Sequence, residues 1–277
     1  MNGFTRYTGI VSLVACCSLF STTVAALENT AVFNTELNAG IEMFRWQEFE
    51  DNGSRLLTEF GPRLFFLAAI NNTDRPRNGF IYEAILKGYT GNVDYDGQDS
   101  DGIFTSSKTI YSGFALELNG GLRITDNVDF DMLAGLGINV WRRDIKDEQN
   151  AQGGLVSGIV EDYNIQYLTL AVGLPQRLAN ADGYLKVGLK SPFSTTEDVE
   201  RFNVRLSPGK KLSGIISYKL TFNANQNNLI SSIMFYYDGF RFSKSPDKVS
   251  VNNNVPVQVH QPKSNLDVFG IAIGHSF

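Results

Sequence analysis

The feature that most constrains this chain is an alternation of apolar and polar residues with a period of two. In the clearest case, residues 128–143, six apolar side chains share one face: Phe130, Met132, Ala134, Leu136, Ile138 and Val140. The opposite face carries charged and small residues, among them Asp131 and Arg143. Successive side chains of a β-strand point to opposite faces, so this pattern predicts a strand with one apolar face.

Ten segments carry this pattern, and turn residues such as Asn, Asp, Gly and Pro separate them. The predicted strands are residues 35–46, 57–70, 80–95, 109–124, 128–143, 162–174, 183–191, 212–222, 229–243 and 266–277. The long connections are residues 47–56, 96–108, 144–161, 192–211 and 244–265, and they alternate with mostly short ones. Long loops at one end and short turns at the other predict an up-and-down antiparallel meander.

The polar face separates a membrane barrel from a soluble β-sandwich. The charged positions on that face are Glu42, Glu59, Arg63, Glu83, Lys87, Glu117, Arg123, Asp129, Asp131, Lys186, Lys190 and Lys219. A sandwich core would have to pair every one of these charges, so we expect the apolar face to point outward, towards lipid. A sheet in lipid has to close. The sequence therefore predicts an all-β fold, a closed up-and-down antiparallel transmembrane β-barrel of ten strands, with eight or twelve strands as the neighbouring alternatives.

The first 26 residues are typical of a secretory signal peptide. Arg6 supplies the positive charge, an apolar stretch follows, and Val24-Ala25-Ala26 offers small residues for cleavage. We therefore predict a signal peptide at residues 1–26 and a barrel at residues 27–277. An alternative is lipoprotein processing at Cys16, because Leu13-Val14-Ala15-Cys16 resembles a lipobox. A transmembrane helix is the third interpretation, but Ser and Thr interrupt the stretch and no basic cluster follows it.

Composition excludes several classes of function. The net charge of −5 argues against a nucleic-acid partner attracted by bulk charge. Two Cys and two His leave little room for a zinc site or a disulfide scaffold. No uninterrupted apolar run of about 18 residues follows Leu27, so no helical span is predicted.

The last ten residues carry the most specific motif. Phe269, Ile271, Ile273 and Phe277 alternate with small or polar residues, and the printed sequence ends on the aromatic residue. This pattern resembles the C-terminal assembly signal of Gram-negative outer-membrane β-barrels. The resemblance implies an outer-membrane protein with both termini in the periplasm. It also implies contact with outer-membrane lipid and lipopolysaccharide, and handling by the barrel-assembly machinery.

Strand number sets the bore of a barrel, and ten strands lie near the size whose interior is filled by side chains. Large aromatic side chains on the inner face are expected to fill the lumen, namely Tyr89, Trp141, Tyr163, Tyr167 and Tyr236. We therefore expect a salt-bridged, largely plugged interior and a structural or surface-binding role in the extracellular loops, for a ligand that the sequence does not identify. The alternative is a narrow channel for small solutes, lined by Glu83, Lys87, Glu117, Arg123, Asp131 and Arg143.

An outer-membrane hydrolase is the third hypothesis. Ten-stranded barrels include the omptin surface proteases, whose catalytic His lies two residues after an Asp. Here Gln258 precedes His260 by two positions, and Asp267 lies eight positions before His275. A Ser–His pair fails as well, because His275 and Ser276 are adjacent on a predicted strand and point to opposite faces. The sequence predicts no catalytic residue.

An acidic segment suggests a metal ion. Asp94, Asp96, Asp99 and Asp101 are evenly spaced and accompanied by glycines. Oxygen ligands on a flexible loop suit Ca²⁺. An EF-hand would need Glu at the twelfth position of the loop, which is Thr105. The alternative is a solvated loop that meets the divalent ions bridging lipopolysaccharide. No other cofactor is predicted.

Overall fold

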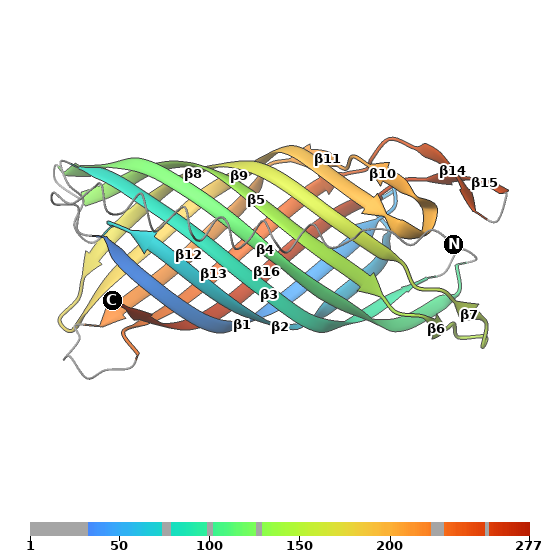
Figure 1. Ribbon diagram of the computed structural model, residues 1–277, viewed down its shortest axis with the longest axis horizontal. Helices are drawn as coiled ribbons and strands as arrows, with labels where there is room; N and C mark the ends of the chain where they lie inside the picture. Colours follow the sequence, from blue (N-terminus) through green and yellow to red (C-terminus); the bar gives the residue numbers. More distant parts are fainter. Residues whose placement is uncertain (1–32, 74–78, 99–101, 126–128, 223–229, 253–254) are drawn as a thin grey trace, which may run out of the picture. The chain divides into compact units, whose positions relative to one another are not determined.

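The computed structural model describes residues 33–73, 79–98, 102–125, 129–222, 230–252 and 255–277. Residues from Asn34 to Phe277 form one compact unit, a closed antiparallel β-barrel (Figure 1). The predicted fold class is confirmed. The predicted signal peptide and Cys16 lie outside the described residues.

Ten long strands form the wall, as predicted. They are β1 (Asn34–Phe49), β2 (Arg55–Asn71), β3 (Phe80–Gln98), β4 (Phe104–Thr125), β5 (Asp129–Ile145), β8 (Val160–Arg177), β9 (Ala181–Val199), β12 (Ser213–Phe222), β13 (Ser232–Ser243) and β16 (Lys263–Ser276). Each pairs with the next in chain order, and β16 pairs with β1 from Lys263 to Ser276, which closes the sheet. None of the described residues belongs to a helix long and apolar enough to cross a membrane.

The two ends of the barrel differ. At the terminal end β1 begins and β16 ends (Figure 1). The opposite end, the loop end, carries the short elements β6 (Glu148–Gln149), β7 (Leu155–Val156), η1 (Glu200–Phe202), β10 (Val204–Leu206), β11 (Gly209–Lys211), β14 (Lys248–Asn252) and β15 (Val255–Val259). Three of the long connections predicted from the sequence, residues 144–161, 192–211 and 244–265, therefore contain structure of their own at the loop end.

The apolar faces of the strands form an outward belt. Its exposed residues include Leu37, Ile41, Leu64, Phe66, Leu86, Leu118, Leu136, Leu170, Phe235 and Ile271. The alternate positions point inward and are buried, including charged residues such as Glu42, Glu59 and Asp131. Such an inside-out distribution is what a strand wall in lipid requires. The residues of the predicted assembly signal, Phe269, Ile271, Ile273 and Phe277, are all exposed. Their role as a signal stays a prediction.

β9 is longer than the sequence predicted. The predicted strand ends at residue 191, but β9 continues to Val199. Pro192 faces Tyr167 of β8, and the register shifts between Gln166 and Tyr167, so a bulge absorbs the proline. Proline lacks an N–H donor and is tolerated in strands at such bulges. The predicted loop 96–108 is also shorter, because the regular pairing of β3 with β4 continues to Gln98 and Phe104.

Inward-facing glycines make room for aromatic rings on the neighbouring strand. Gly137 of β5 is in register with Tyr167 of β8, and Gly270 of β16 with Tyr236 of β13. A Cβ atom on either glycine would collide with the tyrosine ring opposite. The rings therefore lie flat against the wall, where they fill the lumen and cover glycines that would otherwise weaken the strands.

Candidate functional site

The lumen holds two separate cavities. The vestibule, at the loop end, has a volume of about 810 Å³. The terminal-end cavity has a volume of about 160 Å³ and extends to Asn71 and Thr73. No residue lines both cavities. Between them lies a layer of buried side chains, the plug, formed by Phe44, Trp46, Tyr111, Trp141, Arg143, Tyr163, Phe240 and Phe242.

Aromatic rings make up most of the plug. Trp141 stacks on Tyr163 with ring centroids 4.8 Å apart. Trp46 meets both rings edge-on, and its centroid lies 6.0 Å from that of Phe242. Phe242 in turn stacks on Phe240 at 6.1 Å. These residues come from β1, β5, β8 and β13, so the packed rings tie together strands from different parts of the wall.

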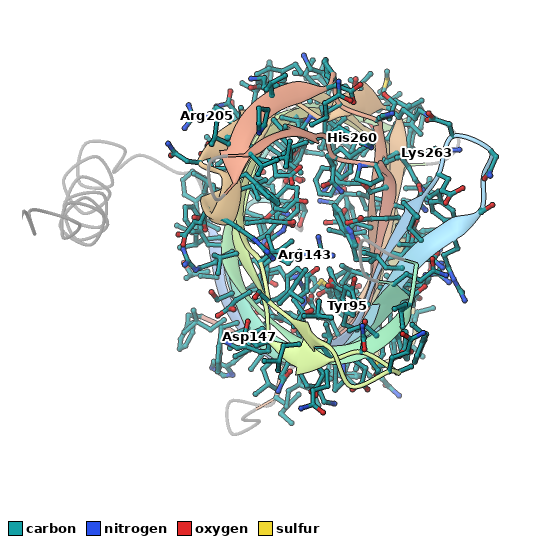
Figure 2. All side chains as sticks on the ribbon, turned by 90° about the vertical axis from the view of Figure 1, so that its right-hand side faces the viewer. Tyr95, Arg143, Asp147, Arg205, His260 and Lys263 are labelled. Atoms are coloured by element: carbon teal, nitrogen blue, oxygen red, sulfur yellow. The ribbon has the colours of Figure 1, made fainter. Side chains whose placement is uncertain are left out.

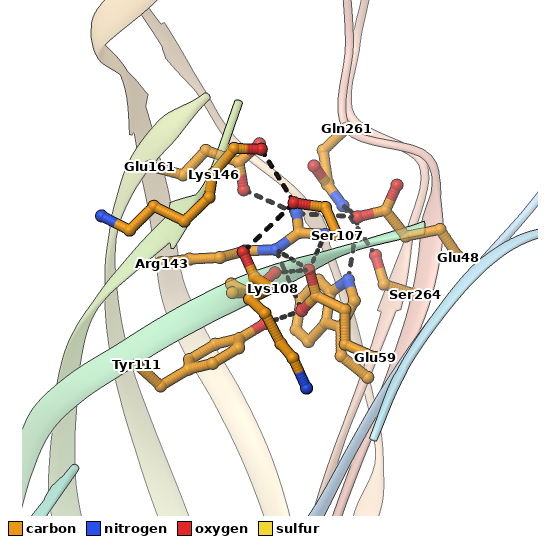
Figure 3. Close-up of polar contacts among 12 residues, drawn as sticks. Glu48, Glu59, Ser107, Lys108, Tyr111, Arg143, Lys146, Glu161, Gln261 and Ser264 are labelled. Carbon is orange, nitrogen blue, oxygen red and sulfur yellow. Dashed lines mark hydrogen bonds and ion pairs between the residues drawn. The ribbon is translucent and has the colours of Figure 1, made fainter. Parts of the chain in front are cut away.

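Arg143 is the polar centre of the plug (Figure 3). Its side chain is buried, and Nη1 donates hydrogen bonds to Glu48 at 3.1 Å and Glu161 at 2.7 Å. Its Nε and Nη2 donate to Glu59 at 3.1 and 3.0 Å. Glu59 also accepts a hydrogen bond from Tyr111. One guanidinium therefore cross-links β1, β2, β5 and β8 through charge-assisted hydrogen bonds.

A fourth buried acidic residue lies in the same part of the wall. Glu197 of β9 is in register with Tyr163, and its Oε2 atom has no hydrogen-bond partner among the described residues. Two other buried polar atoms in the same part of the wall, Trp141 Nε1 and Thr195 Oγ1, are also unpartnered there. Four carboxylates thus surround the single guanidinium of Arg143. Burying a charge without a counter-charge is costly, so this region carries a large electrostatic load.

The terminal-end cavity is electrically balanced. Its lysines each meet a carboxylate: Lys87–Glu42 at 2.5 Å, Lys186–Glu83 at 2.6 Å, Lys190–Asp238 at 2.8 Å and Lys219–Glu36 at 2.5 Å. Glu42 also accepts from Arg63, which lies over the ring of Phe44. Four lysines and four acidic residues line this cavity, so its described lining carries equal numbers of cations and anions.

The six residues predicted to line a channel are split between these regions. Glu83, Lys87 and Glu117 line the terminal-end cavity. Arg123 and Asp131 form a 2.7 Å ion pair between β4 and β5, and Asp131 also accepts from Tyr184, which lines that cavity. Arg143 lies in the plug. All six are in the interior, but they do not line one continuous path. Their role in conduction stays a prediction.

Asp129 departs from its expected position. It was expected on the inner face with Asp131, but it is exposed at the first position of β5. The strand begins there, so the wall offers too few neighbours to bury its side chain.

The predicted calcium ligands do not all lie on a loop. Asp94 and Asp96 belong to β3, on its exposed outer face, because the pairing of β3 with β4 extends to Gln98. The Asp94 carboxylate meets Lys108 of β4. Asp99 and Asp101 lie outside the described residues. Ca²⁺ binding by these four residues stays a prediction.

The vestibule is framed by the elements of the loop end. Tyr95 and Gln98 of β3, Phe202 of η1 and Gln258 of β15 contribute to its lining, together with His260. Figure 2 looks into the barrel from this end and shows Arg143 and Tyr95 pointing into the lumen. None of the residues that define the plug is among those that line the vestibule. Aromatic rings, amides and charged groups converge in the vestibule, as they do in small-molecule sites.

His260 has a partner that residue spacing did not reveal. Its Nδ1 lies 3.0 Å from Oδ1 of Asp247, which precedes it by thirteen positions. Asp247 comes directly before β14 and His260 directly after β15. The pair therefore clamps the base of the β14–β15 hairpin at the edge of the vestibule.

Comparison with known proteins identifies the fold and not a family. No family model matches the chain, and no curated protein does. Among solved structures, the outer membrane protease OmpT from Escherichia coli is similar with a TM-score of 0.51 and 10% identity, over 90% of this chain and 99% of that one. The β-domain of the Bordetella autotransporter BrkA matches with a TM-score of 0.38 and 14% identity, over 85% and 98% of the two chains.

The likeness to OmpT, at so low an identity, concerns the fold alone. A closed ten-stranded antiparallel barrel with an apolar outer belt and a charged lumen is the fold of bacterial outer-membrane β-barrels, and this chain has that fold. A likeness at 10% identity assigns no activity to this chain.

Proposed function

We propose that this chain is a non-conducting, non-enzymatic outer-membrane barrel that binds a ligand at the cell surface through its vestibule. In this proposal both termini face the periplasm, and the loop end faces outward. The barrel wall supplies a rigid frame, and the short elements of the loop end shape the binding surface. Binding residues are commonly found on loops that a rigid scaffold positions.

The plug is the observation that carries this proposal. Its side chains are buried and packed together between the two cavities, and Arg143 is hydrogen-bonded to carboxylates on β1, β2 and β8. A path for solutes would require these bonds to break. The volume of the vestibule, about 810 Å³, is within the range of ligand pockets.

Planar-bilayer recording tests whether the lumen is closed. We expect the refolded protein to give no discrete openings above the membrane background. The matched control is the double variant Phe240→Ala with Phe242→Ala. It removes two aromatic rings from the plug without removing an ion pair, and it should give measurable current. Reproducible openings of the unaltered protein that change with Arg123→Gln or Glu117→Gln would overturn the proposal in favour of the narrow channel.

Intrinsic fluorescence reports on the plug directly, because the chain contains two Trp and both lie in it. Trp46 is 1% exposed and Trp141 is 3% exposed. We expect acrylamide to quench the folded protein far less than the protein unfolded in guanidinium. A Phe202→Trp variant places a third indole in the vestibule, and its added emission should be quenched readily. Equal quenching of the folded and unfolded unaltered protein would show that water and solutes reach the plug.

The narrow channel is a second candidate because the terminal-end cavity already forms part of a path. Charged side chains line it down to the terminal end. The channel would then require movement of the plug alone. The bilayer experiment separates the two candidates, since a gated channel opens under some voltage and a fixed plug does not.

A further inference from the structure

Basic side chains gather on the outer surface of the barrel directly above the lipid-facing belt. On β1 the last exposed apolar residue is Met43, and its partner on β16 is Phe269, also exposed. The next outward pair along the same two strands is Arg45 and Asp267. The outer surface therefore changes from apolar to charged between two successive outward residues of β1, Met43 and Arg45. Such a change is expected where lipid tails end and head groups begin.

Asp267 holds two arginines in place. Its carboxylate accepts from Arg45 Nη2 at 2.7 Å, from Arg241 Nη2 at 2.5 Å and from the Tyr237 hydroxyl at 2.8 Å. The Asp267 side chain is only 4% exposed, whereas Arg45 is 45% exposed and Arg241 29%. Among the described residues, Arg45 donates only through Nε and Nη2, both to Asp267, so its Nη1 donors can bind a further acceptor. Arg241 donates through Nη1 to the carbonyls of Phe240 and Leu266 and through Nη2 to Tyr237 and Asp267, which leaves its Nε for a ligand.

Two lysines extend the group. Lys211 of β11 is in register with Arg241 of β13, so both side chains leave the sheet on the same face. Lys263 of β16 is exposed and shares the outward parity of Asp267. We call Arg45, Lys211, Arg241 and Lys263 the basic patch. It contains four cations, and among the described residues the carboxylate paired with any of them is that of Asp267.

The opposite side of the rim is built differently. There the outward arginines are neutralised: Arg142 meets Asp162 at 3.2 Å and Glu200 at 3.0 Å, and Arg205 meets Asp198 at 2.7 Å. Figure 2 shows Arg205 and Lys263 on opposite sides of the mouth. Arg45 and Arg241 therefore share one carboxylate, whereas Arg142 and Arg205 each have at least one carboxylate of their own.

We propose that the basic patch binds the phosphate groups of lipid A, the membrane anchor of lipopolysaccharide. Arginine pairs bind phosphate through short, charge-assisted hydrogen bonds, and a basic cluster at the membrane surface attracts anionic head groups. The belt directly below supplies apolar surface for the acyl chains through Met43 and Phe269. A free phosphate would use only the charges, whereas a phosphorylated lipid uses both parts. The inference requires the loop end to face outward and is independent of ligand binding in the vestibule.

Titration of the refolded protein in neutral detergent with bisphosphorylated lipid A, followed by native mass spectrometry, tests this site. We expect saturable binding of lipid to the unaltered protein. Arg45→Gln and Arg241→Gln should each weaken it about tenfold, because each removes a charge-assisted hydrogen bond. The matched controls Arg142→Gln and Arg205→Gln change an outward arginine on the other side of the rim and should leave the affinity unchanged.

Three further arms identify the ligand. Lipid A without phosphates should bind about tenfold more weakly. Phosphatidylglycerol and inorganic phosphate should not compete at equal concentration. Each variant is first checked for folding by circular dichroism, and Arg45→Lys, which keeps the charge, serves in place of a variant that fails to fold. The proposal would be overturned if the patch variants and the control variants bound lipid A equally well. It would also be overturned if dephosphorylated lipid A or phosphatidylglycerol bound as tightly as bisphosphorylated lipid A, or if inorganic phosphate alone displaced the lipid.

Discussion

Replacing Arg143 by leucine is expected to lower the free energy of unfolding by about 3–5 kcal/mol, because it leaves Glu48, Glu59, Glu161 and Glu197 buried without a cation. The same change removes hydrogen bonds that tie β5 to β1, β2 and β8. Equilibrium unfolding in guanidinium, performed in lipid bilayers, measures the loss.

Arg142→Leu is the control for this prediction. Arg142 is the preceding residue and carries the same group, but its side chain is 45% exposed on the outer face and its ion pairs are solvated. Exposed pairs contribute about 0–1 kcal/mol, so we expect a small effect. Glu197→Gln keeps the shape of this buried side chain without an ionisable group, and the variant should be at least as stable as the unaltered protein. Similar losses for the two arginine variants would contradict the assignment of Arg143 as the centre of the plug.

Replacing Leu136 by arginine should destabilise the barrel by about 2–4 kcal/mol, the cost of an arginine on the lipid face near the middle of the membrane. Leu136 is 56% exposed, and its register partners on the two neighbouring strands, Leu118 and Leu168, are exposed leucines as well. It therefore lies inside the belt and not at its margin. The difference in unfolding free energy in bilayers again provides the measurement.

The matched control for the belt is Asn92→Arg. Asn92 is an exposed outward residue of β3 in a stretch that continues into Asp94 and Asp96, beyond the apolar part of that strand. There a new charge remains in water or among head groups, so stability should change little. If both variants cost the same, the outward leucines would not be in contact with lipid.

Most of the fold could be predicted because alternation fixes which face of a strand meets lipid. The ten predicted strands correspond to the ten strands of the wall. The predicted strand bounds are wrong where residues that favour a turn or loop are nevertheless paired with a neighbouring strand. Pro192 favoured a turn after residue 191, yet pairing with β8 continues past it through a bulge. Likewise, the acidic and glycine-rich segment around Asp94 is typical of a loop, but pairing with β4 holds it in β3.

The interior could be predicted only in part. Trp141 and Tyr163 were expected to fill the lumen, and both lie in the plug. Trp46, Phe240 and Phe242 were not expected there, because apolar residues were assigned to the outer face. The alternation itself could have placed them in the lumen. Trp46, for example, lies four positions after Glu42 and therefore on the same face of the strand as that charged residue. Partners from opposite walls, such as Arg143 and Glu48, are set by the curvature of the closed barrel, which no local pattern records.

The seam between β1 and β16 has a consequence for how the barrel can form. Every other pair in the wall joins strands that follow one another, so each can zip as a hairpin of short sequence separation. The seam joins Glu36 to Ser276 and can form only after the others have brought its edges together. Until then β1 and β16 expose unpaired backbone groups, which in lipid is costly and in water invites aggregation. Closure is therefore the slow and vulnerable step, and the strand that carries the predicted assembly signal is one of the two that wait for it.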